Sequence, residues 1–232
     1  MPEQIVIIVA AGTGSRFGSE MPKQFLPLCG TPVVAHAINA FREALGSGAR
    51  ILLVLSESMI PLWRRLCADL AIESPEIVTG GATRWESVRN AIAALADASP
   101  SATVLNHDGA RPLVTPEVIR RAASCALNTD GAIPAVPVTD SLRRLDDSEV
   151  MSEPVDRSLF RAVQTPQAFS LWRLREAYRL PYQDDFTDDA SVLAAAGFQN
   201  VVLVGGSPEN IKITTPVDML LAEAIIKSRA GK

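Results

Sequence analysis

The stretch Ile5–Gly18, IVIIVAAGTGSRFG, followed closely by Pro22-Lys23-Gln24, decides the fold class of this chain. Its first five residues form an unbroken apolar run, which is typical of a strand buried on both faces of a parallel sheet. The small residues and glycines that follow let the backbone come close to a ligand, because glycine has no Cβ. Backbone N–H groups in such a loop form a concave anion site, and Arg16 and Lys23 add positive charge. The loop therefore suits a triphosphate, although an ordinary strand-to-helix turn with two surface cations fits the same sequence.

Two familiar nucleotide loops are excluded. The dinucleotide fingerprint G-x-G-x-x-G fails because the third glycine, Gly18, falls one residue late. The P-loop pattern fails because no Lys-Ser or Lys-Thr follows the glycines. The sequence thus indicates a nucleotide site of another kind.

The bulk composition is that of an ordinary globular protein with a substantial core: 232 residues, 47% hydrophobic and 21% charged. A formal net charge of −4 argues against nucleic-acid or acidic-membrane partners, which need a basic footprint. An anionic substrate must therefore be held by a local cluster of cations.

Cysteine usage and the N-terminus indicate a cytoplasmic protein. Cys29, Cys67 and Cys125 are widely spaced and form no C-x-x-C motif, so neither a zinc site nor a disulfide framework is indicated. The apolar run at 5–9 is too short for a signal peptide or a membrane span, and no basic segment precedes it.

Apolar runs alternate with segments of helical period along residues 1–232, which predicts one α/β domain with a mostly parallel sheet and helices on both faces. Strands are expected at 5–9, 51–55, around 77, 103–105 and 131–138, and helices from about 32, through 64–70, from 84 and from 188. Thr83 and Glu86 form a capping box. Thr31-Pro32, Thr115-Pro116 and Thr215-Pro216 each predict a capping hydroxyl before a proline at the first helical position.

The segment at about 139–160 breaks the alternation. It is polar, and the turn signal Asp146-Asp147-Ser148 at its middle predicts a hairpin. The pattern fits either a surface insertion or an extended β-arm that packs on a second subunit.

Asp108 follows a buried strand in the segment Asn106–Pro112. Ligands of open α/β sheets bind outside the carboxyl ends of the strands, and a carboxylate beside a triphosphate commonly holds Mg²⁺. We therefore expect Asp108 to bind metal, while a local ion pair between Asp108 and Arg111 is the alternative. His107 is expected to be structural.

Lys212 and the acidic pair Asp188-Asp189 have simple structural explanations. Asn210–Thr214 alternates like a short strand, and a lysine on an edge strand usually blocks strand pairing. The two aspartates open a helix, where the helix dipole favours acidic residues.

Taken in order, these motifs resemble the 2-C-methyl-D-erythritol 4-phosphate cytidylyltransferases of isoprenoid precursor synthesis. The resemblance covers nearly the whole chain, and its motifs are Ala10–Arg16 with Pro22–Gln24, His107–Pro112, Val155–Arg157, Gln164–Gln167, Thr187–Ala190 and Asn210–Thr214.

The resemblance implies a Rossmann-like nucleotidyltransferase fold, a homodimer joined through the arm, and Mg²⁺-dependent transfer of CMP from CTP to a sugar-alcohol phosphate. Arg16 and Lys23 would stabilise the transition state. Lys212, with Arg157 of the neighbouring subunit, would position the acceptor. Substrate contacts are implied for Ala10, Ala11, Gly12, Gly14, Gly81, Ala82, Ser87, Asp108, Arg111 and Thr187. Asp189 replaces the glutamate more common in the family, which leaves its role open.

Three other functions compete with this interpretation. A ribitol-5-phosphate cytidylyltransferase shares these loops, although Arg157 favours methylerythritol phosphate as the acceptor. A non-catalytic nucleotide-binding module could use the same fold, but the joint presence of Arg16, Lys23, Asp108, Arg157 and Lys212 speaks against it. A nicotinamide-dependent dehydrogenase is disfavoured because the fingerprint fails.

Overall fold

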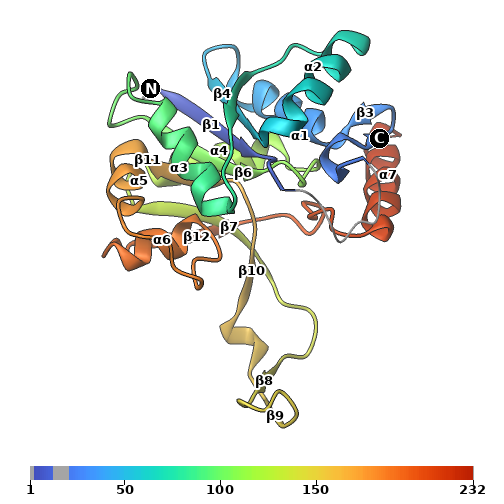
Figure 1. Cartoon of the computed structure of the whole chain (residues 1–232). Coiled ribbons are helices and arrows are strands. Elements are labelled where there is room, and N and C mark those ends of the chain that lie inside the picture. The colour runs from blue at the N-terminus through green and yellow to red at the C-terminus, as the bar shows by residue number, and fades with distance from the viewer. Residues whose placement is uncertain (1–2, 13–20, 232) are drawn as a thin grey trace.

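A computed structural model describes residues 3–12 and 21–231 of the chain. Within these residues, eight strands form one sheet in the order β10-β7-β11-β6-β1-β4-β5, and β12 pairs with β7 (Figure 1). The strands of this sheet are β1 (Gln4–Val9), β4 (Arg50–Leu55), β5 (Glu76–Thr79), β6 (Thr103–Asp108), β7 (Gly131–Pro137), β10 (Arg161–Val163), β11 (Gln167–Ser170) and β12 (Val201–Gly205).

The sheet has a parallel core and two antiparallel strands. β1 pairs in parallel with β4 and β6, β4 with β5, and β12 with β7. β11 is antiparallel to both β6 and β7, and β10 is antiparallel to β7. The predicted α/β class is thus confirmed with a mixed sheet. The carboxyl ends of β1, β4, β6, β7 and β12 meet at one edge.

Helices cover both faces of the sheet, as predicted. One face carries α1 (Val33–Leu45), α2 (Ile60–Asp69) and α4 (Pro116–Ala126), and the other carries α3 (Arg84–Ala94), α5 (Leu171–Ala177) and α6 (Asp189–Ala195). On β1, Val6 and Ile8 join the first core, whereas Ile5 and Ile7 join the second. Burial on both faces explains why this strand is apolar without interruption. A smaller core packs α7 (Pro216–Ala230) against Leu28 and Leu113.

The helix starts agree with the sequence in most cases. The Thr83 hydroxyl accepts a hydrogen bond from the Glu86 N–H at 3.0 Å, which confirms the capping box. Thr115 and Thr215 are N-cap residues followed by proline, but the Thr115 side chain makes no capping bond.

The prediction at Thr31-Pro32 is wrong. These residues form the short strand β3 (Thr31–Pro32), which pairs with β2 (Pro27–Leu28), and Pro32 itself is the N-cap of α1. The hairpin formed by β2 and β3 therefore ends directly where α1 begins, and Thr31 lies one residue too early to cap α1.

The hairpin predicted at about 139–160 is confirmed. β8 (Arg143–Leu145) and β9 (Ser152–Pro154) pair antiparallel, and the Asp146 carboxylate accepts hydrogen bonds from the N–H and hydroxyl of Ser148. The segment extends well away from the rest of the chain (Figure 1). It leaves the sheet at the carboxyl end of β7 and returns through the short helix η4 (Arg157–Leu159) and β10.

No helix within the described residues is both long enough and apolar enough to cross a membrane.

Candidate active site

A pocket of about 400 Å³ lies where β1 and β6 end, beside the first turn of α3. Its lining includes most of the predicted nucleotide-binding positions. The residues that line it are Val9, Ala10, Ala11, Gly12, Lys23, Gln24, Gly81, Ala82, Thr83, Arg84, Ser87, Asp108, Ala110 and Lys212. Arg16 and Gly14 were also predicted here and lie outside the described residues.

Gln24 fixes the backbone at the end of β1. Its side-chain amide nitrogen lies 2.8 Å from the Ala10 carbonyl oxygen and 3.0 Å from the Gly12 carbonyl oxygen. The residue is only 3% exposed. A carbonyl oxygen can only accept a hydrogen bond, so the amide must present its N–H groups to both. Gln24 thereby sets the peptide planes that begin the nucleotide loop.

The opposite wall of the pocket is a close contact between the segment at 80–83 and α3. Gly81 N–H donates to the Ser87 hydroxyl at 3.1 Å, and Ala82 N–H donates to the Glu86 carboxylate at 2.6 Å. A Cβ on Gly81 would lie 2.3 Å from the Glu86 Cβ, so glycine is required there. Because the Ala82 N–H is occupied, its carbonyl is the backbone group left to contact a base.

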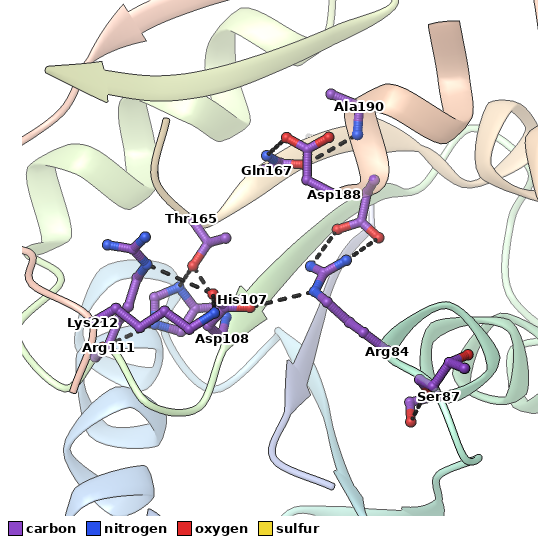
Figure 2. Close-up of polar contacts among 12 residues, drawn as sticks. Arg84, Ser87, His107, Asp108, Arg111, Thr165, Gln167, Asp188, Ala190 and Lys212 are labelled. Carbon is purple, nitrogen blue, oxygen red and sulfur yellow. Dashed lines mark hydrogen bonds and ion pairs between the residues drawn. The ribbon is translucent and has the colours of Figure 1, made fainter. Parts of the chain in front are cut away.

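Asp108 is the centre of a cluster of cations (Figure 2). Its Oδ2 lies 2.8 Å from Lys212 Nζ and 3.8 Å from Arg111 Nε, and its Oδ1 lies 3.5 Å from Arg84 Nε. Burial raises the pKa of Asp108, but the charges of Arg84 and Lys212 outweigh burial and hold that pKa below its usual value. The carboxylate is therefore ionised. The Asp108–Arg111 ion pair expected as the alternative is present, but Lys212 is the nearer cation.

His107 is structural, as expected. Its Nε2 lies 3.0 Å from the Arg111 carbonyl, which can only accept, so Nε2 carries the proton. Nδ1 then accepts from the Thr165 hydroxyl at 3.0 Å, and that hydroxyl accepts in turn from Asp108 N–H. Burial lowers the pKa of His107 to about 4. A neutral histidine in this chain of hydrogen bonds supports the backbone of Asp108.

Asp188 and Asp189 have different roles. Asp188 caps α6 and accepts a hydrogen bond from Ser191 N–H at 2.8 Å, which agrees with the sequence. Asp189 is fully buried and accepts from both Arg84 terminal nitrogens, at 3.0 and 2.7 Å. The helix dipole alone therefore does not account for Asp189.

Arg84 was missed by the sequence analysis. The signal that could have found it is an arginine at the first residue of a helix, where the dipole disfavours a cation. Such a residue needs nearby carboxylates, and the structure supplies Asp108 and Asp189.

Lys212 reaches the pocket from an irregular segment, so the predicted strand at Asn210–Thr214 is wrong. Ile213 N–H donates to the Ala110 carbonyl at 2.8 Å, and the Asn210 side chain donates to the Thr165 carbonyl at 2.9 Å. These bonds fix the segment beside the end of β6 without a strand ladder, and Lys212 does not guard a sheet edge.

Three predicted site residues do not line the pocket. Arg111 lies behind Asp108 and donates to the Asn210 carbonyl at 2.7 Å. Thr187 is an exposed residue before α6. Arg157 lies on η4 and donates to the Thr139 carbonyl.

A pocket at the carboxyl edge of a mixed α/β sheet, with lysine and arginine side chains around one ionised carboxylate, is suited to bringing two phosphate-bearing substrates together. This is the arrangement of a nucleotidyltransferase. Comparison with known proteins shows to which family of nucleotidyltransferases the chain belongs. The family model for 2-C-methyl-D-erythritol 4-phosphate cytidylyltransferase matches residues 4–228, and the chain belongs to this family.

Relatives cover nearly the full length. The chain is similar to the 2-C-methyl-D-erythritol 4-phosphate cytidylyltransferase of Bacteroides thetaiotaomicron, with 44% identity over 97% of this chain and 100% of the relative. It is 43% identical to that of Cereibacter sphaeroides, over 97% of each chain. The crystal structure of the Thermus thermophilus cytidylyltransferase matches with a TM-score of 0.73 and 33% identity, over 98% of this chain and 100% of the other. The chain is thus a nucleotidyltransferase of isoprenoid biosynthesis by the non-mevalonate route.

Proposed function

We propose that this chain transfers CMP from CTP to 2-C-methyl-D-erythritol 4-phosphate, giving 4-diphosphocytidyl-2-C-methyl-D-erythritol and pyrophosphate. Family membership supports the two substrates. The observation that carries the proposal is the pocket itself, in which Lys23, Arg84 and Lys212 line one cavity with Asp108.

The proposed reaction depends on electrostatic stabilisation of the phosphate charges more than on proton transfer. A phosphate oxygen of the acceptor, already ionised at neutral pH, attacks the α-phosphorus of CTP, and the bond to the β-phosphate oxygen breaks to release pyrophosphate. Catalysis of such transfers is almost entirely positioning and charge stabilisation. This fits a pocket whose nearby histidine is buried and neutral.

The proposed roles follow the positions of the cations. Lys23, with Arg16, would neutralise the charge that develops at the α-phosphate and on the leaving pyrophosphate. Lys212, which is 44% exposed although paired with Asp108, can turn towards the acceptor phosphate. The backbone at Ala10, Ala11, Gly12 and Gly81, with Ser87, would hold the nucleotide.

The donor set fits Mg²⁺. This ion takes one or two carboxylates and fills its remaining positions with phosphate oxygens and water. Asp108 supplies one carboxylate on the pocket wall, and no group of three or more potential ligands occurs within residues 3–12 and 21–231. Asp108 would hold the ion, which when bound would offset the negative charge of the triphosphate.

We propose further that residues 1–232 are one catalytic domain and that the arm at about 139–160 joins two copies. Exposed apolar side chains on the arm, among them Val150, Met151 and Leu159, support a partner surface. Arg157 lies on this segment and outside the pocket of its own chain, which supports a role in the pocket of a second copy.

A cytoplasmic location is supported by Cys29, Cys67 and Cys125, which are all unpaired.

Measuring pyrophosphate release tests the proposal. The purified protein is incubated with CTP, Mg²⁺ and either methylerythritol phosphate or ribitol 5-phosphate, and the nucleotide product is identified by its mass. We expect rapid release with the first acceptor, little with the second, and none in excess EDTA. Preference for ribitol 5-phosphate would reassign the acceptor, and no metal-dependent release with either acceptor would favour a non-catalytic nucleotide-binding module.

A further inference from the structure

We propose that Arg84 is a positioning residue, clamped by buried Asp189, that fixes the Asp108 carboxylate for the transfer reaction. The inference rests on the proposed function, because it assigns Arg84 to a step that Asp108 serves.

The clamp begins in the core. Asp189 is fully buried on α6 and holds both terminal nitrogens of Arg84, at 3.0 and 2.7 Å. The Tyr178 hydroxyl donates to Asp189 Oδ1 at 2.5 Å, and the Tyr178 ring stacks on Trp85 with ring centroids 5.7 Å apart. A two-point guanidinium–carboxylate pair has a fixed plane. The orientation of Arg84 is therefore set from inside the protein.

The other end of Arg84 reaches the pocket. With its terminal nitrogens held by Asp189, the Nε of Arg84 faces Asp108 Oδ1 (Figure 2). The two atoms lie 3.5 Å apart, and Arg84 lines the pocket with a side chain that is 28% exposed. Lys212, the more exposed cation, occupies Oδ2. The two carboxylate oxygens of Asp108 thus have different partners. Oδ1 is tied to the core through Arg84, and Oδ2 faces a lysine that can move when substrate arrives.

A lysine could not replace this arginine. Its single ammonium group can approach Asp189 or Asp108 but lacks the planar fork that contacts both. The geometry therefore needs a guanidinium at residue 84, and this requirement separates positioning from simple charge balance.

The first test is Arg84→Lys, with Arg89→Gln as the matched control. Arg89 is an exposed cation on the same helix that contacts the Trp85 ring. We expect kcat of Arg84→Lys to fall about tenfold to 10²-fold, the scale of a misplaced catalytic group, while the KM for CTP and the melting temperature change little. Arg89→Gln should keep wild-type kcat. A folded Arg84→Lys enzyme with wild-type kcat would overturn the inference.

The second test is chemical rescue of Arg84→Ala. Millimolar guanidinium chloride should restore at least part of the lost kcat and raise the melting temperature, whereas ammonium chloride at equal ionic strength should do neither. The double variant Arg84→Ala/Asp189→Ala removes the buried charge together with its partner, so it serves if the single variant does not fold. It should be slow and should not respond to guanidinium. Wild-type kcat in the double variant, or equal rescue of both variants, would contradict the clamp.

The two proposals fail differently. If wild-type protein and Arg89→Gln release no pyrophosphate, the proposed function fails. If both are active and Arg84→Lys is equally active, only the positioning role fails.

Discussion

The Lys212 ammonium lies 2.8 Å from Asp108 Oδ2, although the two residues come from distant parts of the sequence. In this state the lysine neutralises the carboxylate that ends β6. Its 44% exposure leaves it able to exchange this carboxylate for the phosphate of an incoming acceptor. The ion pair with Asp108 therefore holds the Lys212 ammonium beside the position where the proposed reaction needs a cation.

Replacing Lys212 with glutamine should impair acceptor use. We expect kcat/KM for methylerythritol phosphate to fall about 10²-fold, the scale of one preorganised charged contact, while CTP binding measured by calorimetry changes much less. Lys227→Gln is the control, because Lys227 is an exposed lysine on α7 that pairs with Glu223. An equal loss in both variants would argue against a specific role.

Lys23→Ala should lower kcat by about 10²-fold or more, because Lys23 lines the pocket and is proposed to neutralise charge in the transition state. Steady-state pyrophosphate release at saturating substrates measures the effect, and Arg64→Ala, at an exposed position of α2, is the control. Near-normal turnover of the Lys23 variant would exclude the proposed role of Lys23 in stabilising the transition state.

Mixing inactive variants tests whether Arg157 acts across a dimer. Protomers carrying Arg157→Ala and protomers carrying Lys23→Ala should regain activity when they are unfolded together and refolded, because mixed dimers then hold one complete site. Sedimentation velocity on the same samples checks for dimers. If the mixture is dimeric and regains no activity, Arg157 acts in the active site of its own chain.

Gln24→Leu should weaken nucleotide binding. It removes the hydrogen bonds to the carbonyls of buried Ala10 and exposed Gly12. Leaving the buried carbonyl of Ala10 unpaired costs roughly 1–3 kcal/mol unless the loop rearranges. We expect CTP affinity to fall at least tenfold by calorimetry, with Gln199→Leu, an exposed position, as the control. Unchanged CTP affinity would show that the loop keeps its shape without Gln24.

Stability should fall as pH is lowered from about 6.5 to about 4. The folded pKa of His107 is about 4, below its ordinary value of 6.5, so in this window the unfolded chain binds a proton that the folded chain does not. The loss approaches about 1.4 kcal/mol per pH unit, roughly 3 kcal/mol in total. Carboxylates with lowered pKa, such as Asp108 and Asp218, add their own loss from about pH 5 downwards, so the part of the slope above about pH 5 reports His107. Urea denaturation across this range should show the slope, and His107→Gln should flatten it.

The sequence was sufficient for features set by local pattern. The apolar run of β1, the capping box at Thr83 and the hairpin turn at Asp146 each depend on residues within one short segment. Their physical causes are burial on both faces, hydrogen bonding of the first helical N–H groups, and side-chain-to-backbone bonding in a turn.

Features that join distant segments could not be predicted in this way. The place of β11 between β6 and β7 depends on pairings that no local pattern encodes. Lys212 alternates with apolar neighbours as strand residues do, yet its segment is held by single bonds to Ala110 and Thr165. Arg84 gave a local signal, an unfavourable charge at a helix start, but its two partners come from β6 and α6.

The position of β11 also bears on how the protein is made. In the described part of the chain, β11 joins β6-β1-β4-β5 to the group formed by β7, β10 and β12. Synthesis proceeds from the N-terminus, so β6 leaves the ribosome with an unpaired edge, and the whole arm follows before β11 emerges to close it. The nascent chain therefore carries an open sheet edge and the exposed apolar side chains of the arm, such as Val150 and Met151, at the same time. During this interval the chain most needs protection from aggregation.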